Sequence, residues 1–76
     1  MTKNASLPAG WSVELLGMIG MVKFSSRDGR VLEWVDGTWY VARGHVHRTA
    51  AGVPAAHSML EARRIGTAWL TSIDEE

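Results

Sequence analysis

A two-residue turn near the middle of the chain constrains the fold more than any other feature of the sequence. The stretch VLEWVDGTWYV, residues 31–41, holds two runs of β-forming residues joined by Asp36 and Gly37. Asp-Gly between two such runs is a strong hairpin signal, because the favoured two-residue loop needs positive φ at both positions. The stretch therefore predicts an antiparallel pair of strands in which Trp39 lies opposite Trp34.

The turn also sets the register of the neighbouring strands. A two-residue loop places Tyr40 opposite Glu33, and a three-residue loop at residues 27–29 places Lys23 opposite Glu33 from the other side. A register shifted by one residue would bring Lys23 onto the apolar face, so we prefer the first register. The predicted core face holds Val22, Phe24, Leu32, Trp34, Trp39 and Val41. The predicted opposite face holds Lys23, Ser25, Val31, Glu33, Val35, Thr38 and Tyr40.

A helix is predicted to cover the core face. Residues 54–72 have an apolar periodicity of 3.6, and Pro54 suits a first helical turn. The predicted buried stripe consists of Ala55, Met59, Ala62, Ile65, Gly66, Trp69, Leu70 and Ile73, with His57, Glu61, Arg64, Thr67, Ala68 and Thr71 opposite. Ala62 and Gly66 leave a trough in this stripe, and we expect the paired indoles of Trp34 and Trp39 to lie there, beneath Trp69.

These elements predict a single small α+β domain over residues 1–76. Residues 1–9 form a loose lead-in, residues 11–48 a three-stranded antiparallel β-meander, and residues 54–72 one C-terminal α-helix on one face of the sheet. Gly17 and Gly20 interrupt an apolar stretch, so a fourth short strand is expected if they break the first strand. Gly44 is expected to bend the last strand.

Composition narrows the classes of function. Lys and Arg together number 8, as do Asp and Glu, and there is no cysteine. Zero net charge gives no long-range attraction to nucleic acid or to an anionic membrane. Without cysteine, disulfides, thiolate metal sites and thiol catalysis are excluded. The chain has no apolar run of the roughly 20 residues that a membrane span requires, and no convincing secretory signal, so we expect a cytoplasmic protein.

The histidines are the only metal-like grouping, and it is a weak one. His45 and His47 stand two residues apart on a predicted strand and would point the same way. A metal site needs a third ligand, and His57 would have to leave the start of the helix to supply it. We therefore predict no metal site and no cofactor. No catalytic motif is present, so we predict that the protein is not an enzyme and has no small-molecule substrate.

The surplus of apolar residues favours a protein partner. One helix covers one face of the sheet, which leaves the opposite face uncovered. The predicted contact residues on that face are Lys23, Val31, Glu33, Val35 and Tyr40. The apolar segment 15–21 either adds to such an interface or folds back to cap the core edge beside Trp11. We predict a small accessory or inhibitor-like protein-binding module of the kind that phages and mobile elements encode, with a homodimer as one form of partnership.

The alternative is a nucleic-acid-binding domain. A three-stranded sheet followed by one helix resembles, in element order, the DNA-binding domains of the plant AP2 type and of the integrase arm-binding type. That resemblance implies reading of the DNA groove by the uncovered face of the sheet. The basic residues that would serve such a function are Lys23, Arg27, Arg30, Arg43 and Arg48.

Overall fold

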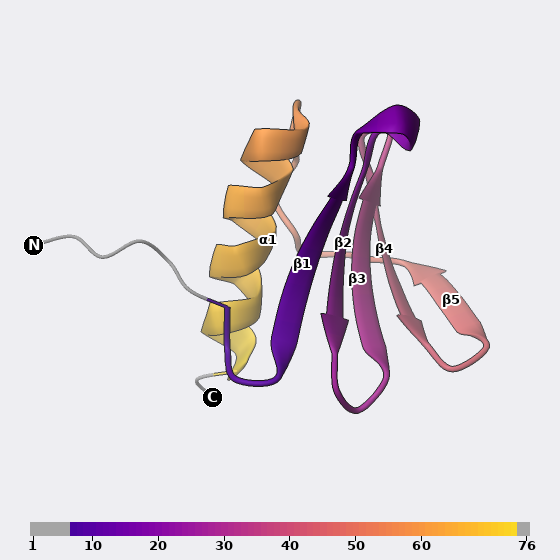
Figure 1. Cartoon of the computed structure of the whole chain (residues 1–76), viewed down its shortest axis with the longest axis vertical. Helices are drawn as coiled ribbons and strands as arrows, with labels where there is room; N and C mark the ends of the chain where they lie inside the picture. The colour runs from indigo at the N-terminus through magenta and orange to yellow at the C-terminus, as the bar shows by residue number, and fades with distance from the viewer. Residues whose placement is uncertain (1–6, 75–76) are drawn as a thin grey trace, which may run out of the picture.

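Five antiparallel strands and one C-terminal helix make up the described part of the chain, residues 7–74 of this computed structural model (Figure 1). The strands follow one another as a meander in the order β1-β2-β3-β4-β5. Their bounds are β1 Trp11–Leu16, β2 Met21–Ser26, β3 Arg30–Val35, β4 Thr38–Arg43 and β5 Val46–Thr49, and helix α1 is Met59–Asp74. The predicted α+β class and the helix on one face are confirmed, but the sheet has more strands than predicted.

Two glycine turns account for the additional strands. A 3₁₀ turn at Gly17–Ile19 separates β1 from β2, and Gly20 follows it in the left-handed conformation at φ 63°. Gly44, at φ 62°, lies in the turn between β4 and β5. Glycine adopts positive φ without steric cost, and both glycines lie in turns that reverse the chain instead of bending a strand. The five-strand sheet also departs from the three-stranded element order of the AP2 and integrase arm-binding domains.

The predicted register is confirmed. Trp39 pairs with Trp34 across the hairpin, and Glu33 lies between Tyr40 of β4 and Lys23 of β2. Asp36 has φ 50° and Gly37 has φ 91°, as the two-residue loop requires. Because side chains alternate along a strand, this register determines the face on which each side chain of the sheet lies.

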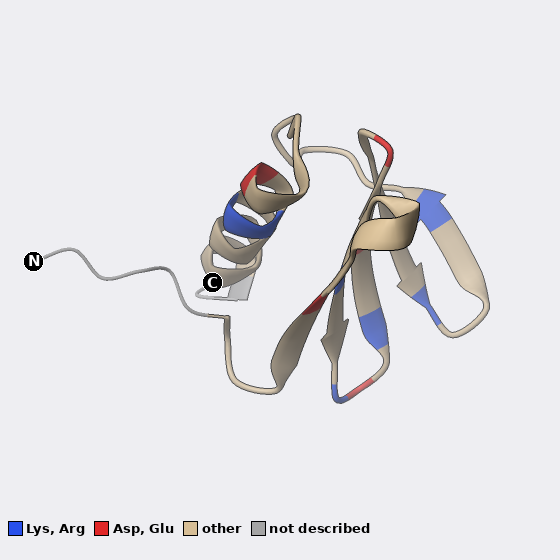
Figure 2. Ribbon diagram, turned by 45° about the horizontal axis from the view of Figure 1, so that its top comes forward, with Lys and Arg blue, Asp and Glu red and all other residues tan. Residues whose placement is uncertain are grey.

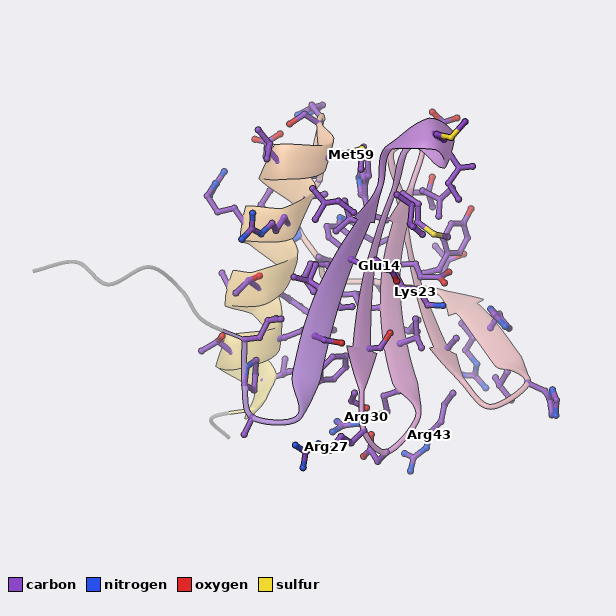
Figure 3. The ribbon with its side chains drawn as sticks, viewed as in Figure 1. Glu14, Lys23, Arg27, Arg30, Arg43 and Met59 are labelled. Atoms are coloured by element: carbon purple, nitrogen blue, oxygen red, sulfur yellow. The ribbon has the colours of Figure 1, made fainter. Side chains whose placement is uncertain are left out.

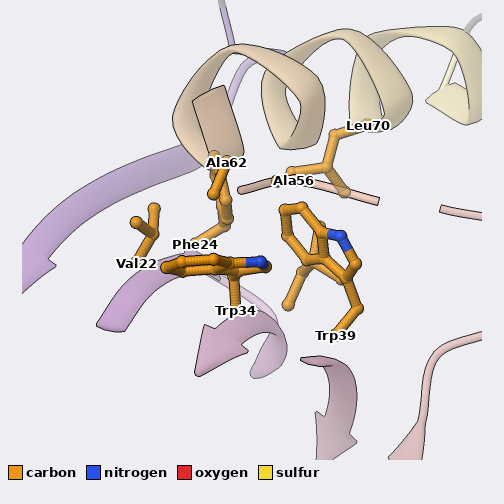
Figure 4. Close-up of a cluster of buried hydrophobic side chains, with 8 residues drawn as sticks. Val22, Phe24, Trp34, Trp39, Ala56, Ala62 and Leu70 are labelled. Atoms are coloured by element: carbon orange, nitrogen blue, oxygen red, sulfur yellow. The ribbon is translucent and has the colours of Figure 1, made fainter. Parts of the chain in front are cut away.

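The core lies between this sheet and α1 (Figure 4). Val22 and Phe24 are completely buried, and Trp34 and Trp39 are exposed by only 6% and 5%. The rest of the core consists of Leu32, Ala56, Ala62 and Leu70, with Val41 partly buried against them. Leu7 also packs against this core, so the end of the predicted loose lead-in is part of the fold. Residues 1–6 of that lead-in lie outside the described residues.

The two core indoles differ in their hydrogen bonding. Trp39 donates its Nε1 hydrogen to the carbonyl oxygen of Pro54 at 3.0 Å, which ties the connection after β5 to the sheet. Trp34 Nε1 is buried and has no acceptor among the described residues. A buried donor without a partner costs on the order of 1–3 kcal/mol, so Trp34 contributes to the core through its apolar area alone.

Helix α1 begins five residues later than predicted, at Met59 rather than at residue 54. Ser58 caps it: the Ser58 hydroxyl accepts the Glu61 backbone N–H at 3.1 Å, and Glu61 in turn accepts the His57 backbone N–H at 2.7 Å. The S-x-x-E signal of a helix start is visible at residues 58–61 and decides the boundary over Pro54. No helix within residues 7–74 combines the length and the apolar character needed to cross a membrane.

The buried side of α1 is rotated from the predicted stripe. Thr67, predicted to face outward, is only 7% exposed, whereas Ile73, predicted to be buried, is 44% exposed. Ala55 is exposed and precedes the helix. The sheet lies under the i, i+4 line of Ala62, Gly66 and Leu70, and Thr67 borders that line.

The trough at Ala62 and Gly66 is present, but Phe24 occupies it together with Trp39. A Cβ atom at Gly66 would lie 2.5 Å from two ring atoms of Phe24 and 3.1 Å from Cη2 of Trp39. The Phe24 and Trp39 ring centroids are 6.3 Å apart. The expected pairing of the Trp34 and Trp39 indoles in this trough is thus corrected: Phe24 takes the place of Trp34 beneath Gly66.

We predict that Gly66→Ala destabilises the protein although alanine is the better helix former. The helix-propensity gain is about 1 kcal/mol. The added methyl would lie 2.5 Å from the ring of Phe24, which is fully buried, and such overpacking costs about 1–3 kcal/mol. Urea unfolding should therefore show a net loss of about 1 kcal/mol. In a Phe24→Leu background the cost should shrink, since leucine lacks the ring atoms in question. An increase in stability on Gly66→Ala would contradict this close packing.

Candidate functional site

No described element covers the face of the sheet away from α1 (Figure 3). We call it the open face. Strand alternation and the observed register assign to it Ser12, Glu14, Leu16, Met21, Lys23, Ser25, Val31, Glu33, Val35, Thr38, Tyr40, Ala42, His47 and Thr49. The five predicted contact residues, Lys23, Val31, Glu33, Val35 and Tyr40, all lie on it and are all half-buried by their neighbours.

A row of charged and polar residues crosses the centre of the open face. Successive strand pairs align Glu14, Lys23, Glu33, Tyr40 and Thr49, which we call the charged row. Lys23 lies between two carboxylates on the neighbouring strands. Directly opposed residues lie about 4.5–5.5 Å apart at their Cβ atoms, so the signs alternate over short distances.

One end of the open face is apolar. Leu16, Met21 and Val35 align on three neighbouring strands, and together with Thr38 they form what we call the apolar row. The turn Gly17–Ile19 continues this end, with Met18 fully exposed and Ile19 62% exposed. None of the residues in that turn is buried, so the turn does not cap the core.

A second group of polar residues surrounds the turn between β2 and β3. Asp28 accepts hydrogen bonds from the Ser26 hydroxyl and, at 3.0 Å, from Nε of Arg30. The Arg30 guanidinium also lies 5.3 Å from the ring centroid of Trp11. A shallow groove passes between these residues and Arg27. We call Trp11, Ser26, Arg27, Asp28 and Arg30 the turn-end cluster.

The turn-end cluster changes the acidity of Asp28. The hydrogen bond from Ser26, and after it the one from Arg30, lower the pKa of Asp28 to about 2. Both donors stabilise the ionised carboxylate, which is why the shift is downward. Arg30 is held on both sides, by this carboxylate and by Trp11, so it is a structural ion-pair partner rather than an unassigned cation.

The basic residues of the nucleic-acid alternative do not share one face. Lys23 is on the open face, whereas alternation places Arg30, Arg43 and Arg48 on the side of the helix. Arg27 lies in the turn after β2. Arg27, Arg30 and Arg43 come together at one end of the sheet (Figure 3), but charges of both signs are spread over the whole molecule (Figure 2).

The histidines occupy three different settings. His45 lies in the turn before β5, His47 is on β5, and His57 lies beside Glu61 at the start of α1, with Nδ1 3.4 Å from the carboxylate. Within residues 7–74 no three histidine or acidic side chains come close enough together to hold a metal ion. Ser25 and His47 share a row of the open face but are three strands apart, roughly 14 Å, which is too far for proton transfer.

Glu14 carried no predicted role, and Leu16 and Met21 belonged to the segment 15–21, for which an interface and a cap on the core edge were both left open; all three complete rows of the open face. Their positions depend on the turn at Gly17–Ile19, because only a chain reversal there brings β1 alongside β2. The two glycines at positions 17 and 20 are the sequence signal for this chain reversal. A tight turn between them would have placed Glu14 opposite Lys23.

Comparison of the chain with protein-family models, with curated proteins and with solved structures finds no match.

We predict that an NMR titration of Asp28 gives a pKa of about 2, below its ordinary value of 3.8. A pKa that is depressed in the folded state adds stability above the ordinary value, and this stability is lost as the pH falls from 3.8 toward about 2. Asp28→Asn should therefore flatten the acid side of the stability curve in that window. In Ser26→Ala the pKa of Asp28 should rise toward 3.8, because the hydrogen bond that lowers it most is gone. An unchanged pKa in Ser26→Ala would contradict the assignment of the cause.

Proposed function

We propose that this protein is a non-enzymatic protein-binding module and that the open face is its contact surface. The observation that carries the proposal is the one-sided cover of the sheet: α1 lies against β2 and β3 on one face, and no described element lies against the other (Figure 1). In a small domain, an uncovered face with a contiguous apolar part is a common mark of an interaction site.

The composition of the open face supports a macromolecular partner. The apolar row supplies a desolvated contact area, and the charged row beside it supplies hydrogen bonds and charge complementarity. Interfaces combine an apolar core with a polar surround, and tyrosine and methionine are enriched in them. Tyr40 and Met21 fit that pattern, and Met21 can adapt to an irregular partner surface.

The shape of the surface favours a protein over a small molecule. Among the described residues, shallow grooves lie at the turn-end cluster, beside Trp69 on α1, and between β4 and β5 at Val46. The side chains that line them lie outside the charged and apolar rows. Small-molecule sites bury most of their ligand in a concave pocket, which a flat face does not provide.

The proposal predicts a cross-linking pattern. A photo-reactive amino acid at Tyr40, in the open face, should give covalent adducts of discrete mass in the native host. The same group at Arg63, an exposed position on α1, should give none. The adducts are detected by gel mobility and mass spectrometry. Equal labelling from both positions, or labelling from Arg63 alone, would refute the open face as the contact surface.

Nucleic-acid binding is the second candidate, and the meeting of Arg27, Arg30 and Arg43 at one end of the sheet is the observation in its favour (Figure 3). Two features weaken it. Asp28 lies within the same group and neutralises Arg30. Formal net charge is zero, and phosphate neutralisation supplies most of the affinity of such proteins.

We therefore predict that the protein is not retained on heparin and does not bind random duplex DNA at about 50 µM protein. That concentration lies within the range of about 10⁻⁴–10⁻⁶ M in which non-specific DNA binding has its dissociation constants. Fluorescence anisotropy over a salt series measures this. Micromolar binding that falls steeply with salt would favour the turn-end arginines. Arg27→Ala should then lower the salt slope by about one.

A further inference from the structure

We propose that the partner of the open face is a second copy of this chain, related by a two-fold axis that runs parallel to the strands between β2 and β3. The inference rests on the proposed function and names its partner. In such an arrangement the two open faces pack against each other, β2 of one copy faces β3 of the other, and β1 faces β4. Face-to-face sheets keep their strands within about 30° of each other, which this axis allows.

The charged row is self-complementary under this symmetry. Lys23 of one copy faces Glu33 of the second copy, and the symmetry repeats the same pair in the opposite direction. Glu14 of one copy faces the phenol of Tyr40 in the second copy, so a carboxylate meets a hydroxyl donor. All four strands in the overlap contribute one complementary partner each.

The other two rows match under the same operation. Met21 faces Val35 of the second copy, and Leu16 faces Thr38, which brings the two apolar ends together. A third row contains Ser25 and Val31 and is separated from the apolar row by the charged row. In it, Ser25 faces Val31 of the second copy. The operation keeps each row at its own height along the strands, so apolar residues are never set against the charged row.

The competing two-fold axis does not give this match. A two-fold axis that also lies midway between the two sheets but runs perpendicular to the strands would place each strand over the same strand of the second copy. Lys23 would then face Lys23, and Glu33 would face Glu33, which are like-charge contacts that cost energy at an interface. The charge pattern of the row therefore selects the axis parallel to the strands.

The charges of the row are available for intermolecular pairing. Among residues 7–74, neither Lys23, Glu14 nor Glu33 takes part in an ion pair within 4.0 Å in its own chain. With 8 basic and 8 acidic residues, two copies approach each other without net repulsion.

The β5 edge of the sheet is a poorer site for self-association. Strand β5 has four residues, all exposed, and two of them are His47 and Arg48. Short edge strands that carry charge are a common device against edge-to-edge pairing. The open face is therefore a better surface for a second copy than this edge.

The size of the contact sets the affinity to expect. Four strands of six residues each cover roughly 400 Å² per copy at the usual spacings of a sheet. A standard interface buries about 800 Å² per partner, and a contact of about half that area fits a weak, transient association, so we expect a weak dimer.

A charge-reversal and mixing experiment tests the proposal. Sedimentation equilibrium of the purified chain from about 10 µM to 1 mM should show a monomer–dimer equilibrium, in keeping with a weak interface. Lys23→Glu and Glu33→Lys should each weaken dimerisation by about tenfold or more, because each sets like charges against each other in both symmetry-related pairs. Arg63→Glu, a matched reversal on the exposed side of α1, should leave the dimer unchanged.

The equimolar mixture of the two variants is the decisive sample. The new carboxylate at position 23 of one chain then faces the new ammonium at position 33 of the other, and the remaining pair is complementary as well. Dimers should return in the mixture at the concentration where each variant alone is a monomer. Mixing leaves the charge repulsion inside each chain unchanged, so this recovery separates a contact between copies from a change in folding.

Two results would overturn the inference: a wild-type chain that stays monomeric up to about 1 mM, beyond the range of weak interfaces, or a mixture that stays monomeric while the wild type dimerises. Cross-links from Tyr40 distinguish failure of the second-copy inference from failure of the proposed protein-binding function. Adducts of twice the chain mass, joined at residues 11–16, support the second copy. Adducts with a different protein from a monomeric chain overturn the second copy and keep the protein-binding function, and the absence of both overturns both.

Discussion

The close approach of α1 to the sheet at Gly66 is the contact on which the rest of the structure depends. Two ring atoms of Phe24 lie 2.5 Å from the point where a Cβ atom at this position would be, and Trp39 lies 3.1 Å from it. A larger residue at 66 would raise the helix off the sheet and open the space over Val22 and Leu32, which are now buried. In a chain of 76 residues the core is thin, so the loss of a few contacts would affect most of it. The helix is thereby committed to one face, and no element of residues 7–74 covers the other face.

The register of the central strands could be predicted from the sequence because it depends on local chemistry. Asp36 and Gly37 specify a loop length, the loop length specifies the opposed residues, and alternation then assigns Trp34 and Trp39 to the core face. The number of strands could not be predicted in the same way. Gly20 and Gly44 are compatible with a bend or with a reversal, and the contacts of the neighbouring strands decide between the two.

The helix shows the same division between local and tertiary causes. Its start is local, since Ser58 and Glu61 cap it, and the sequence carries that signal although Pro54 also suits a first helical turn. Its buried side is tertiary: Thr67 is buried and Ile73 is not, because the position of the sheet selects the contact line. For the candidate site, the central residues Lys23, Glu33 and Tyr40 followed from the hairpin register, whereas Glu14 required the turn before β2 to be known.

The fully exposed thioether of Met18 has a consequence for the chemistry of the surface. An oxidant reaches this sulfur without any opening of the fold, and the turn that carries it contains no buried residue. Conversion to the sulfoxide replaces a flexible apolar side chain by a polar one, and reductases reverse that change. The apolar end of the open face can therefore be made polar and apolar again by redox chemistry at one side chain, while the core beneath the helix is unaffected.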